Sequence, residues 1–353
     1  MRVETLLPLG KVDPGLRAAE TPLDVRRVGE DARLVEELGY DGLAVEETKE
    51  DPYVVMALAA QATTRLRLTT AVAMAFPRSP TITAMSAWTI QKLSGGRFVL
   101  GLGSQVRGHI VRRFGLDYRP PGPWMRDYVG AVRAVWASWQ RRAKLAFESE
   151  HYRLSLMVPL FDPGPIAHPD IPIHVAAVNP YMCRIAGEVA DGIRPHPVCT
   201  PRYIREVMLP AVATGAAKAG RDPGRIAVAM KPLICAAPDE AALALKARDV
   251  RARVAFYAST PGYRAAFEAH GLGDLAAELA RLSRAQRWEE MAPRISDEIL
   301  HTYAVVGTYG EIGRKLIERY RGLVTDVEFS IPAASEHERG RLRELVQDIQ
   351  RAG

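Results

Sequence analysis

Polar side chains that could transfer protons follow short apolar runs of the sequence. Glu47 and Thr48 come directly after the run Gly42–Glu46, and His196 comes just after Gly192–Arg194. A positioned carboxylate can act as a general base, and a histidine is the side chain whose ordinary pKa lies nearest neutrality. A helix-capping acid at the first position and a loop histidine at the second are the alternative interpretations.

Another polar stretch follows the run Phe98–Leu102. It reads Ser104-Gln105-Val106-Arg107-Gly108-His109, and His109 is a further side chain that could supply a proton. The alternative is that His109 caps the next helix or faces water. The preceding Gly101-Leu102-Gly103 is not a dinucleotide-binding fingerprint, because the third glycine position is Val106 and the segment ends a fourth strand rather than a first.

A short loop precedes a predicted helix. It reads Ala177-Val178-Asn179-Pro180, and Pro180 suits the first turn of a helix, whose free N–H groups attract anions. By contrast, the sequence has no His-x-x-x-His pair and no carboxylate cluster. We therefore expect no metal site.

Short apolar strands alternate with amphipathic helices along the chain, and this alternation predicts a parallel sheet. The predicted strands are Val3–Leu7, Gly42–Glu46, Arg67–Ala71, Phe98–Leu102, Ile173–Ala176, Gly192–Arg194, Ala227–Ala236 and Val327–Ser330. The predicted helices are a segment from an N-cap at Thr21 to Leu38, Pro52–Thr63, Pro80–Leu93, Pro123–Gln140, Pro180–Ala190, Pro201–Ala219 and one from a capping box at Thr308 to Tyr320. Strands each followed by a helix predict an α/β fold, a closed (β/α)₈ TIM barrel, as one domain over residues 1–353.

Two segments are longer than ordinary connections. Ser155–Pro172 is rich in proline, and we expect an irregular excursion there. Asp239–Thr302 follows the seventh strand, and we expect a helical insertion near the mouth of the barrel, where its βα loops and its chemistry lie.

Three motifs occur in a fixed order at the ends of predicted strands. They are Gly39-Tyr40-Asp41-Gly42-Leu43-Ala44-Val45-Glu46-Glu47-Thr48, Gly96-Arg97-Phe98-Val99-Leu100-Gly101-Leu102-Gly103-Ser104, and Pro172-Ile173-His174-Val175-Ala176-Ala177 with Ala190-Asp191-Gly192 after one helix. In this order and spacing the chain resembles the luciferase-like flavin and deazaflavin oxidoreductases, a family of TIM-barrel proteins. The resemblance extends over nearly the whole chain.

The resemblance implies a set of cofactor-binding residues. A non-prolyl cis peptide at Ala71-Val72 would back the cofactor ring, with an ordinary strand end as the alternative. Ser104 and Gln105 replace the family's Ser/Thr-Gly segment. The backbone of Ala177, Val178 and Asn179 would approach the cofactor phosphate, where family members often carry paired glycines.

The resemblance also implies acid–base residues, and here the chain departs from the pattern. Glu47 matches the family's acid at the end of the second strand, but Thr48 stands where deazaflavin-dependent members carry a proton-transferring histidine. The glutamate that some members carry after the fourth strand is also missing. Protein-mediated proton transfer would then fall to His109 or His196.

The cofactor expected from the resemblance is the deazaflavin F420. Residues 47–49, 101–105 and 190–193 are similar to the deazaflavin branch, whose members transfer a hydride between the ring and a small organic substrate. An FMN-dependent monooxygenase is the first alternative. A catalytically silent cofactor-binding barrel is the second.

Composition narrows the class of partner. The formal net charge of +6 favours anions such as a phosphorylated cofactor, but the basic residues are spread along the chain, so we expect no nucleic-acid partner. There is no apolar run of the roughly 18 residues that span a membrane and no apolar signal-peptide core, so we expect no membrane association.

The three cysteines lack CxxC spacing, which favours a reduced, cytoplasmic protein. Related proteins are commonly dimers, so we expect a homodimer.

Overall fold

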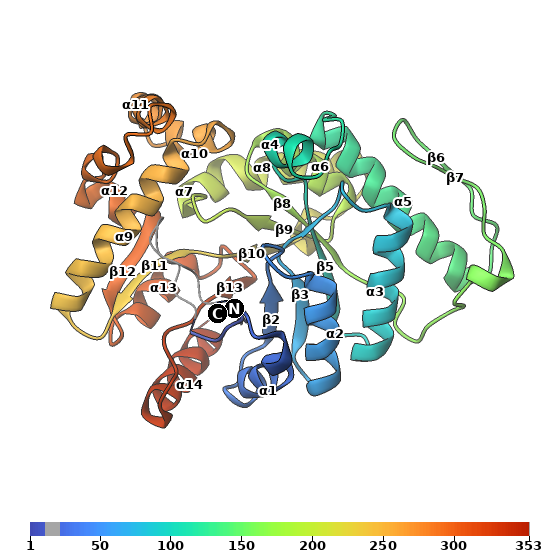
Figure 1. The fold of residues 1–353 in the computed structure, drawn as a ribbon, viewed down its shortest axis with the longest axis horizontal. Coiled ribbons are helices and arrows are strands. Elements are labelled where there is room, and N and C mark those ends of the chain that lie inside the picture. The colour runs from blue at the N-terminus through green and yellow to red at the C-terminus, as the bar shows by residue number, and fades with distance from the viewer. Residues whose placement is uncertain (11–21, 353) are drawn as a thin grey trace.

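Eight parallel strands close into a barrel in the computed structural model, which describes residues 1–10 and 22–352 (Figure 1). In ring order they are β1 (Arg2–Leu6), β2 (Gly42–Val45), β3 (Arg67–Thr70), β5 (Phe98–Gly103), β8 (Ile173–Ala177), β9 (Gly192–Pro195), β10 (Ala227–Met230) and β13 (Asp326–Glu328). β13 pairs with β1 and closes the ring. The predicted (β/α)₈ TIM barrel is confirmed.

Helices cover the outside of the barrel (Figure 1). They are α1 (Val28–Glu37), α2 (Pro52–Ala62), α3 (Pro80–Ser94), α5 (Pro121–Arg141), α6 (Pro180–Val189), α7 (Pro201–Tyr203), α8 (Leu209–Lys218), α13 (Ile312–Tyr320) and α14 (Glu336–Arg351). A π-helical segment, Ile204–Met208, joins α7 to α8. Proline in the first turn is common to α2, α3, α5 and α6, where its missing N–H costs no hydrogen bond.

Two predicted boundaries need correction. Thr21 lies outside the described residues, and the helical segment starts instead at Val25, where the Asp24 side chain accepts a hydrogen bond from the Arg26 N–H. At the other end of the chain, the Glu311 carboxylate accepts from the Thr308 N–H as a capping box requires, but α13 begins only at Ile312.

The seventh strand is also shorter than predicted. Ala227–Ala236 is not one strand, because it is interrupted at Lys231-Pro232, where proline has no N–H to donate to a neighbouring strand. Its second part, β11 (Leu233–Ala237), leaves the barrel and pairs in parallel with β12 (Ala304–Thr308).

The expected insertion after the seventh strand is mainly helical. It contains α9 (Glu240–Ala258), α10 (Arg264–Glu268), α11 (Gly273–Arg284) and α12 (Asp297–Tyr303), and these helices lie with β11 and β12 beside the barrel (Figure 1). Buried apolar residues of the insertion belong to the same hydrophobic cluster as the barrel core. The insertion is therefore an extension of a single domain.

Short elements accompany the connections that follow β3, β5 and α5. β4 (Ala73–Met74) and a short helix, α4 (Arg107–Arg112), flank β5, and an antiparallel hairpin, β6 (Phe147–Glu148) with β7 (Arg153–Leu154), follows α5. Between the hairpin and Pro172 the only regular element is the 3₁₀ turn Pro159–Phe161. The predicted irregular excursion is therefore confirmed.

Charged side chains fill the amino-terminal part of the barrel interior. Asp326 accepts hydrogen bonds from Arg2 and Arg67, and Glu4 pairs with Arg194. Although burial alone would raise the pKa of Asp326, the Arg2 hydrogen bond and the Arg67 charge lower it well below its usual range. Buried charges are tolerated only when paired in this way.

Candidate active site

The chain breaks direction at the carboxyl end of β3. The Ala71-Val72 peptide bond is cis, as the resemblance implied, and the chain then continues as β4 beside β5. Thr70 Oγ1 donates to the Gly101 carbonyl (2.8 Å) and accepts from the Gly101 N–H (2.9 Å). These bonds fix the break against the neighbouring strand.

Two glycines of β5 make room for this break. A Cβ at Gly101 would lie 1.8 Å from the Thr70 carbonyl oxygen, and a Cβ at Gly103 would lie 2.5 Å from Val72 Cγ2. Both positions therefore require glycine for close approach rather than for a turn. The half-buried Val72 side chain therefore packs directly on β5, and Val72 with these two glycines forms one wall of the barrel mouth.

Glu47 anchors this wall from the end of β2. Its Oε2 accepts from the Met74 N–H (2.7 Å), and both of its oxygens accept from the Arg78 guanidinium at 2.7–2.8 Å. Only 11% of the Glu47 side chain is exposed. The carboxylate thus holds β4 in place.

The other predicted site residues from this part of the chain lie in different surroundings. Half-buried Gln105 has a positive φ of 57° and reaches the Met74 sulfur with its side-chain nitrogen (3.8 Å). Ser104 is half-buried beside it. His109 is exposed on α4, whereas Thr48 lines a pocket of about 470 Å³ beside the end of β1.

The loop after β8 forms a helix N-terminus at the mouth. The Asn179 side chain accepts from the Met182 N–H (2.9 Å) and caps α6, with Pro180 in the first turn as predicted. The Val178 carbonyl accepts from the Tyr203 hydroxyl (3.0 Å), and Ala177 is buried. The loop therefore presents the capped N-terminus of α6 at the carboxyl end of β8, and a helix N-terminus is able to bind an anion.

An ionic cluster occupies the other side of the mouth. Lys231 Nζ lies 2.7 Å from Glu46 Oε1 and 3.5 Å from Glu328 Oε1. Glu328 and Lys231 each follow the last register pair of β13 and β10, Val327 with Met230, by one residue. Burial raises the pKa of Glu328 to about 7, although the Lys231 charge opposes the shift.

Consecutive residues at the end of β2 serve different sides of the mouth. Successive side chains of an extended chain point to opposite faces. Accordingly Glu47 contacts Arg78 and β4, whereas Glu46 reaches Lys231 at the end of β10.

His196 belongs with the ionic cluster rather than with the residues near β3. Its ring stacks on Tyr263 (centroids 4.0 Å apart) and meets the edge of Tyr257 (4.6 Å), both from the inserted segment. Burial lowers the pKa of His196 to about 3, and the Lys231 charge adds to the shift. We therefore expect His196 to be a neutral imidazole near pH 7.

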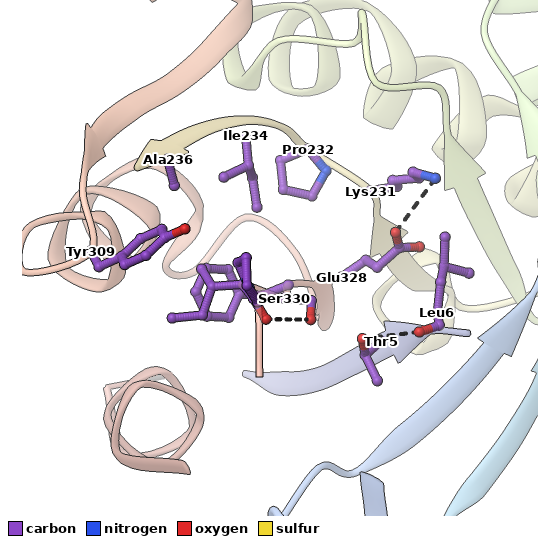
Figure 2. A pocket seen from close by; sticks show the side chains of 12 residues that line it. Thr5, Leu6, Lys231, Pro232, Ile234, Ala236, Tyr309, Glu328 and Ser330 are labelled. Atoms are coloured by element: carbon purple, nitrogen blue, oxygen red, sulfur yellow. Dashed lines mark hydrogen bonds and ion pairs between the residues drawn. The ribbon is translucent and has the colours of Figure 1, made fainter. Parts of the chain in front are cut away.

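A pocket opens between the ionic cluster and the β11–β12 sheet, and Figure 2 shows it. It encloses about 640 Å³ of space that is partly open to solvent. Lys231 and Glu328 lie together on one side and Tyr309 lies on the other (Figure 2). The rest of the lining is mainly apolar: Thr5, Leu6, Pro232, Ile234, Ala236, Phe329, Ser330, Ile331 and Pro332.

Sequence reasoning missed Lys231, Glu328 and Tyr309. For Glu328 the sequence did contain a signal, because Asp326 and Glu328 alternate with apolar residues in β13. Alternate side chains of a strand point to the same face, so two charged residues at this spacing in a buried strand point into the barrel. For Lys231 the signal was weaker, namely a lysine between a buried strand and a proline.

Comparison with known proteins supports the resemblance. Residues 1–326 match the family model described as luciferase-like monooxygenase. An uncharacterised protein of Mycobacterium tuberculosis (strain H37Rv) is 41% identical over 315 residues, which cover 89% of this chain and 93% of that protein. A putative coenzyme F420-dependent oxidoreductase of the same organism is 29% identical over 303 residues, covering 80% and 84%.

A solved structure shares the fold. The coenzyme F420-dependent tetrahydromethanopterin reductase of Methanopyrus kandleri superposes with a TM-score of 0.73 at 19% identity, covering 99% of this chain and 98% of that one. This likeness shows the TIM-barrel fold, and the family model shows the family. The chain belongs to the luciferase-like monooxygenase family, and its relatives include F420-dependent oxidoreductases.

Proposed function

We propose that this protein is an F420-dependent oxidoreductase that transfers a hydride between the deazaflavin and a small organic substrate. The observation that carries the proposal is the wall that Val72 and the glycines of β5 form at the barrel mouth. The relative named as a putative F420-dependent oxidoreductase supports the choice of cofactor.

The residues of the mouth fit such a cofactor. The surface at Val72, where two glycines carry no side chains, suits a planar ring, and the capped N-terminus of α6 suits a phosphate. When bound, the deazaflavin would supply the hydride chemistry. The protein would orient the ring through Val72 and hold the wall in place through Glu47.

A binding titration tests the choice of cofactor. We expect F420 to bind with a dissociation constant well below 100 μM, measured by fluorescence quenching, and FMN to bind at least about tenfold more weakly. A tenfold ratio corresponds to about 1.4 kcal/mol. Tighter binding of FMN would favour the monooxygenase alternative, and binding of neither would contradict the oxidoreductase proposal.

A variant pair can locate the phosphate in the same assay. Val178→Asp places a negative charge beside the N-terminus of α6, so it should weaken F420 binding at least tenfold. Val158→Asp, in the exposed part of the irregular excursion, is the matched control and should leave binding unchanged. Equal effects of the two substitutions would argue against a phosphate at α6.

A homodimer and a cytoplasmic location complete the proposal. The three cysteines are buried and free, which suits a reducing compartment. None of the described helices has the length and apolar character needed to cross a membrane.

Apolar side chains exposed on two neighbouring helices support the homodimer. They are Val54 and Leu58 on α2 and Ile82, Met85 and Leu93 on α3. Within each helix these side chains are spaced so that they lie on one side, and together they form one outward apolar face. An exposed apolar face of this kind marks an interface. Sedimentation should give twice the chain mass, and Met85→Glu should halve it while the control Leu245→Glu on α9 should not.

A further inference from the structure

We propose that the pocket between the ionic cluster and the β11–β12 sheet binds an organic ammonium ion, that is, a protonated amine on an apolar body, and that Glu328 is the counter-ion of this amine. None of the described residues that line the pocket belongs to the β3–β5 wall or to the loop before α6. The pocket is therefore a second site, and ligand binding there requires neither a bound cofactor nor hydride transfer.

The charges around Glu328 cancel in pairs. Lys231 Nζ lies 2.7 Å from Glu46 Oε1 but 3.5 Å from Glu328 Oε1, so Glu46 is its nearer partner. Arg194 of β9 pairs with Glu4 of β1. These four are the charged groups that face Glu328. Because their two positive and two negative charges sum to zero, an ionised Glu328 adds one negative charge that they do not balance.

A buried carboxylate in this position can lose its excess charge in two ways. It can take up a proton, and burial accordingly raises the pKa of Glu328 to about 7, although the Lys231 charge opposes the shift. It can instead meet a cation that enters from the pocket, which Glu328 lines with only 11% of its side chain exposed. Attraction between charges is stronger in such a poorly hydrated place than in water.

The one other titratable group that is known to face Glu328 from a neighbouring segment carries no charge. It is Tyr40, whose hydroxyl donates to the Phe329 carbonyl (3.1 Å). Burial raises the pKa of Tyr40 well above its ordinary value, so the phenol stays protonated near neutral pH. Glu328 is therefore the group whose ionisation responds to a ligand in this pocket.

The lining indicates an organic cation rather than a metal ion. Calcium and magnesium ions take six or more oxygen ligands. Among the described residues that line the pocket, Glu328 supplies the one carboxylate, and no described cluster of His, Cys, Asp or Glu side chains could hold a metal ion. The apolar side chains of Ile234, Phe329 and Ile331 instead suit a hydrocarbon body, and the space of about 640 Å³ is that of a small-molecule site.

The arrangement of the lining orients such a ligand. Glu328 lies on one side of the pocket and Tyr309 on the other, with Ile234 and Ala236 of β11 between them (Figure 2). An ammonium group at Glu328 therefore places the apolar body along β11 and its far end toward Tyr309. An anionic ligand would meet the unbalanced charge of Glu328, so the pocket selects its ligand by charge.

Isothermal titration calorimetry without added cofactor tests the charge of the ligand. The three probes share one skeleton: cyclohexylmethylamine is cationic at pH 7, cyclohexanecarboxamide is neutral and cyclohexanecarboxylate is anionic. We expect the amine to bind with a dissociation constant of about 1 mM or lower, and at least about tenfold more tightly than either of the others. Absence of amine binding, or a smaller preference, would overturn the proposal.

The same titration tests the role of Glu328. About half of the Glu328 side chains are protonated at pH 7, so binding of the amine should release about half a proton per ligand. Titrations in buffers of different ionisation enthalpy measure this release. For the same reason the affinity should rise about tenfold from pH 6 to pH 8, where the amine itself stays protonated. Binding without proton release would overturn the role of Glu328.

Two variants separate the charge from the space. Glu328→Gln should weaken amine binding at least about tenfold and abolish the proton release, whereas the control Glu318→Gln, on the exposed face of α13, should change neither. Ala236→Phe fills the pocket from β11 without altering a charge and should weaken binding as much, which keeps the test decisive if Glu328→Gln does not fold. Unchanged amine binding in either pocket variant would contradict the assigned site.

Discussion

The two sides of the barrel mouth are built by different means. Around β3 and β5 the structure depends on close backbone approach, with glycines at 101 and 103 and a carboxylate, Glu47, that is bound on both oxygens. Around β10 and β13 it depends on charge, with Lys231 between Glu46 and Glu328. The first side offers a fixed surface, and the second offers a group that can exchange a proton.

The difference predicts that the two sides respond differently to mutation. A backbone clash lowers stability strongly, because it can be removed only if a strand moves within a closely packed interior. Partly exposed ion pairs can relax, since a carboxylate that loses its partner can take up a proton or meet water.

The largest effect should come from Gly101→Ala. The new Cβ would lie 1.8 Å from the Thr70 carbonyl oxygen, so β3 and β5 must separate locally. We expect a loss of about 3 kcal/mol or more in the free energy of unfolding, measured by urea denaturation. The control Gly340→Ala meets open space in α14 and should be neutral or stabilising; equal losses in both would contradict the close-approach argument.

An intermediate effect should come from His196→Gln, and it should depend on pH. The pKa of His196 is about 3 when folded and near 6.5 when unfolded, so the unfolded state binds more protons between these values. Wild-type stability relative to the variant should therefore rise with pH over this window, by about 3 kcal/mol between pH 4 and 6.5.

A second variant separates titration from packing at this histidine. Tyr263→Leu removes the stacked ring but keeps the imidazole. Its stability should fall at every pH while the slope with pH persists. If the stability of His196→Gln rises with pH as steeply as that of the wild type, His196 does not contribute to the pH dependence.

The smallest effect should come from Lys231→Met. The Lys231 side chain is 21% exposed, so the loss should be about 1 kcal/mol at pH 8, where both carboxylates are ionised. The loss should shrink at pH 5, because Glu328 is protonated there and repels Glu46 less. Denaturation at the two pH values checks this, and an equal loss at both would argue against a titrating Glu328.

The sequence predicted the β3–β5 side well and the β10–β13 side poorly. The N-terminus of α6 was predicted from Asn179-Pro180, and the cis bond at Ala71-Val72 was expected from the family resemblance. The close-approach role of Gly101 and Gly103 emerged only from the structure. The barrel itself was predictable because each strand and helix carries its own apolar period.

The ionic cluster was not predictable in the same way. Glu46, Lys231 and Glu328 come from three strands, and only closure of the ring brings their side chains together. The break at Pro232 also depends on tertiary structure, because Ala227–Ala236 has the apolar content of one strand. His109 looked equivalent to His196 in sequence, yet one is exposed on α4 and the other is packed between tyrosines.

The assignment of the cofactor to the β3–β5 side of the mouth, rather than to the ionic cluster, can be tested in one assay, the dissociation constant for F420 in two variants. Gly103→Ala would place a Cβ 2.5 Å from Val72 Cγ2 and displace the surface that backs the ring. We predict that this variant binds F420 at least about tenfold more weakly, whereas Glu328→Gln binds within about twofold of the wild type. Unchanged binding in Gly103→Ala, or an equal loss in Glu328→Gln, would contradict the account.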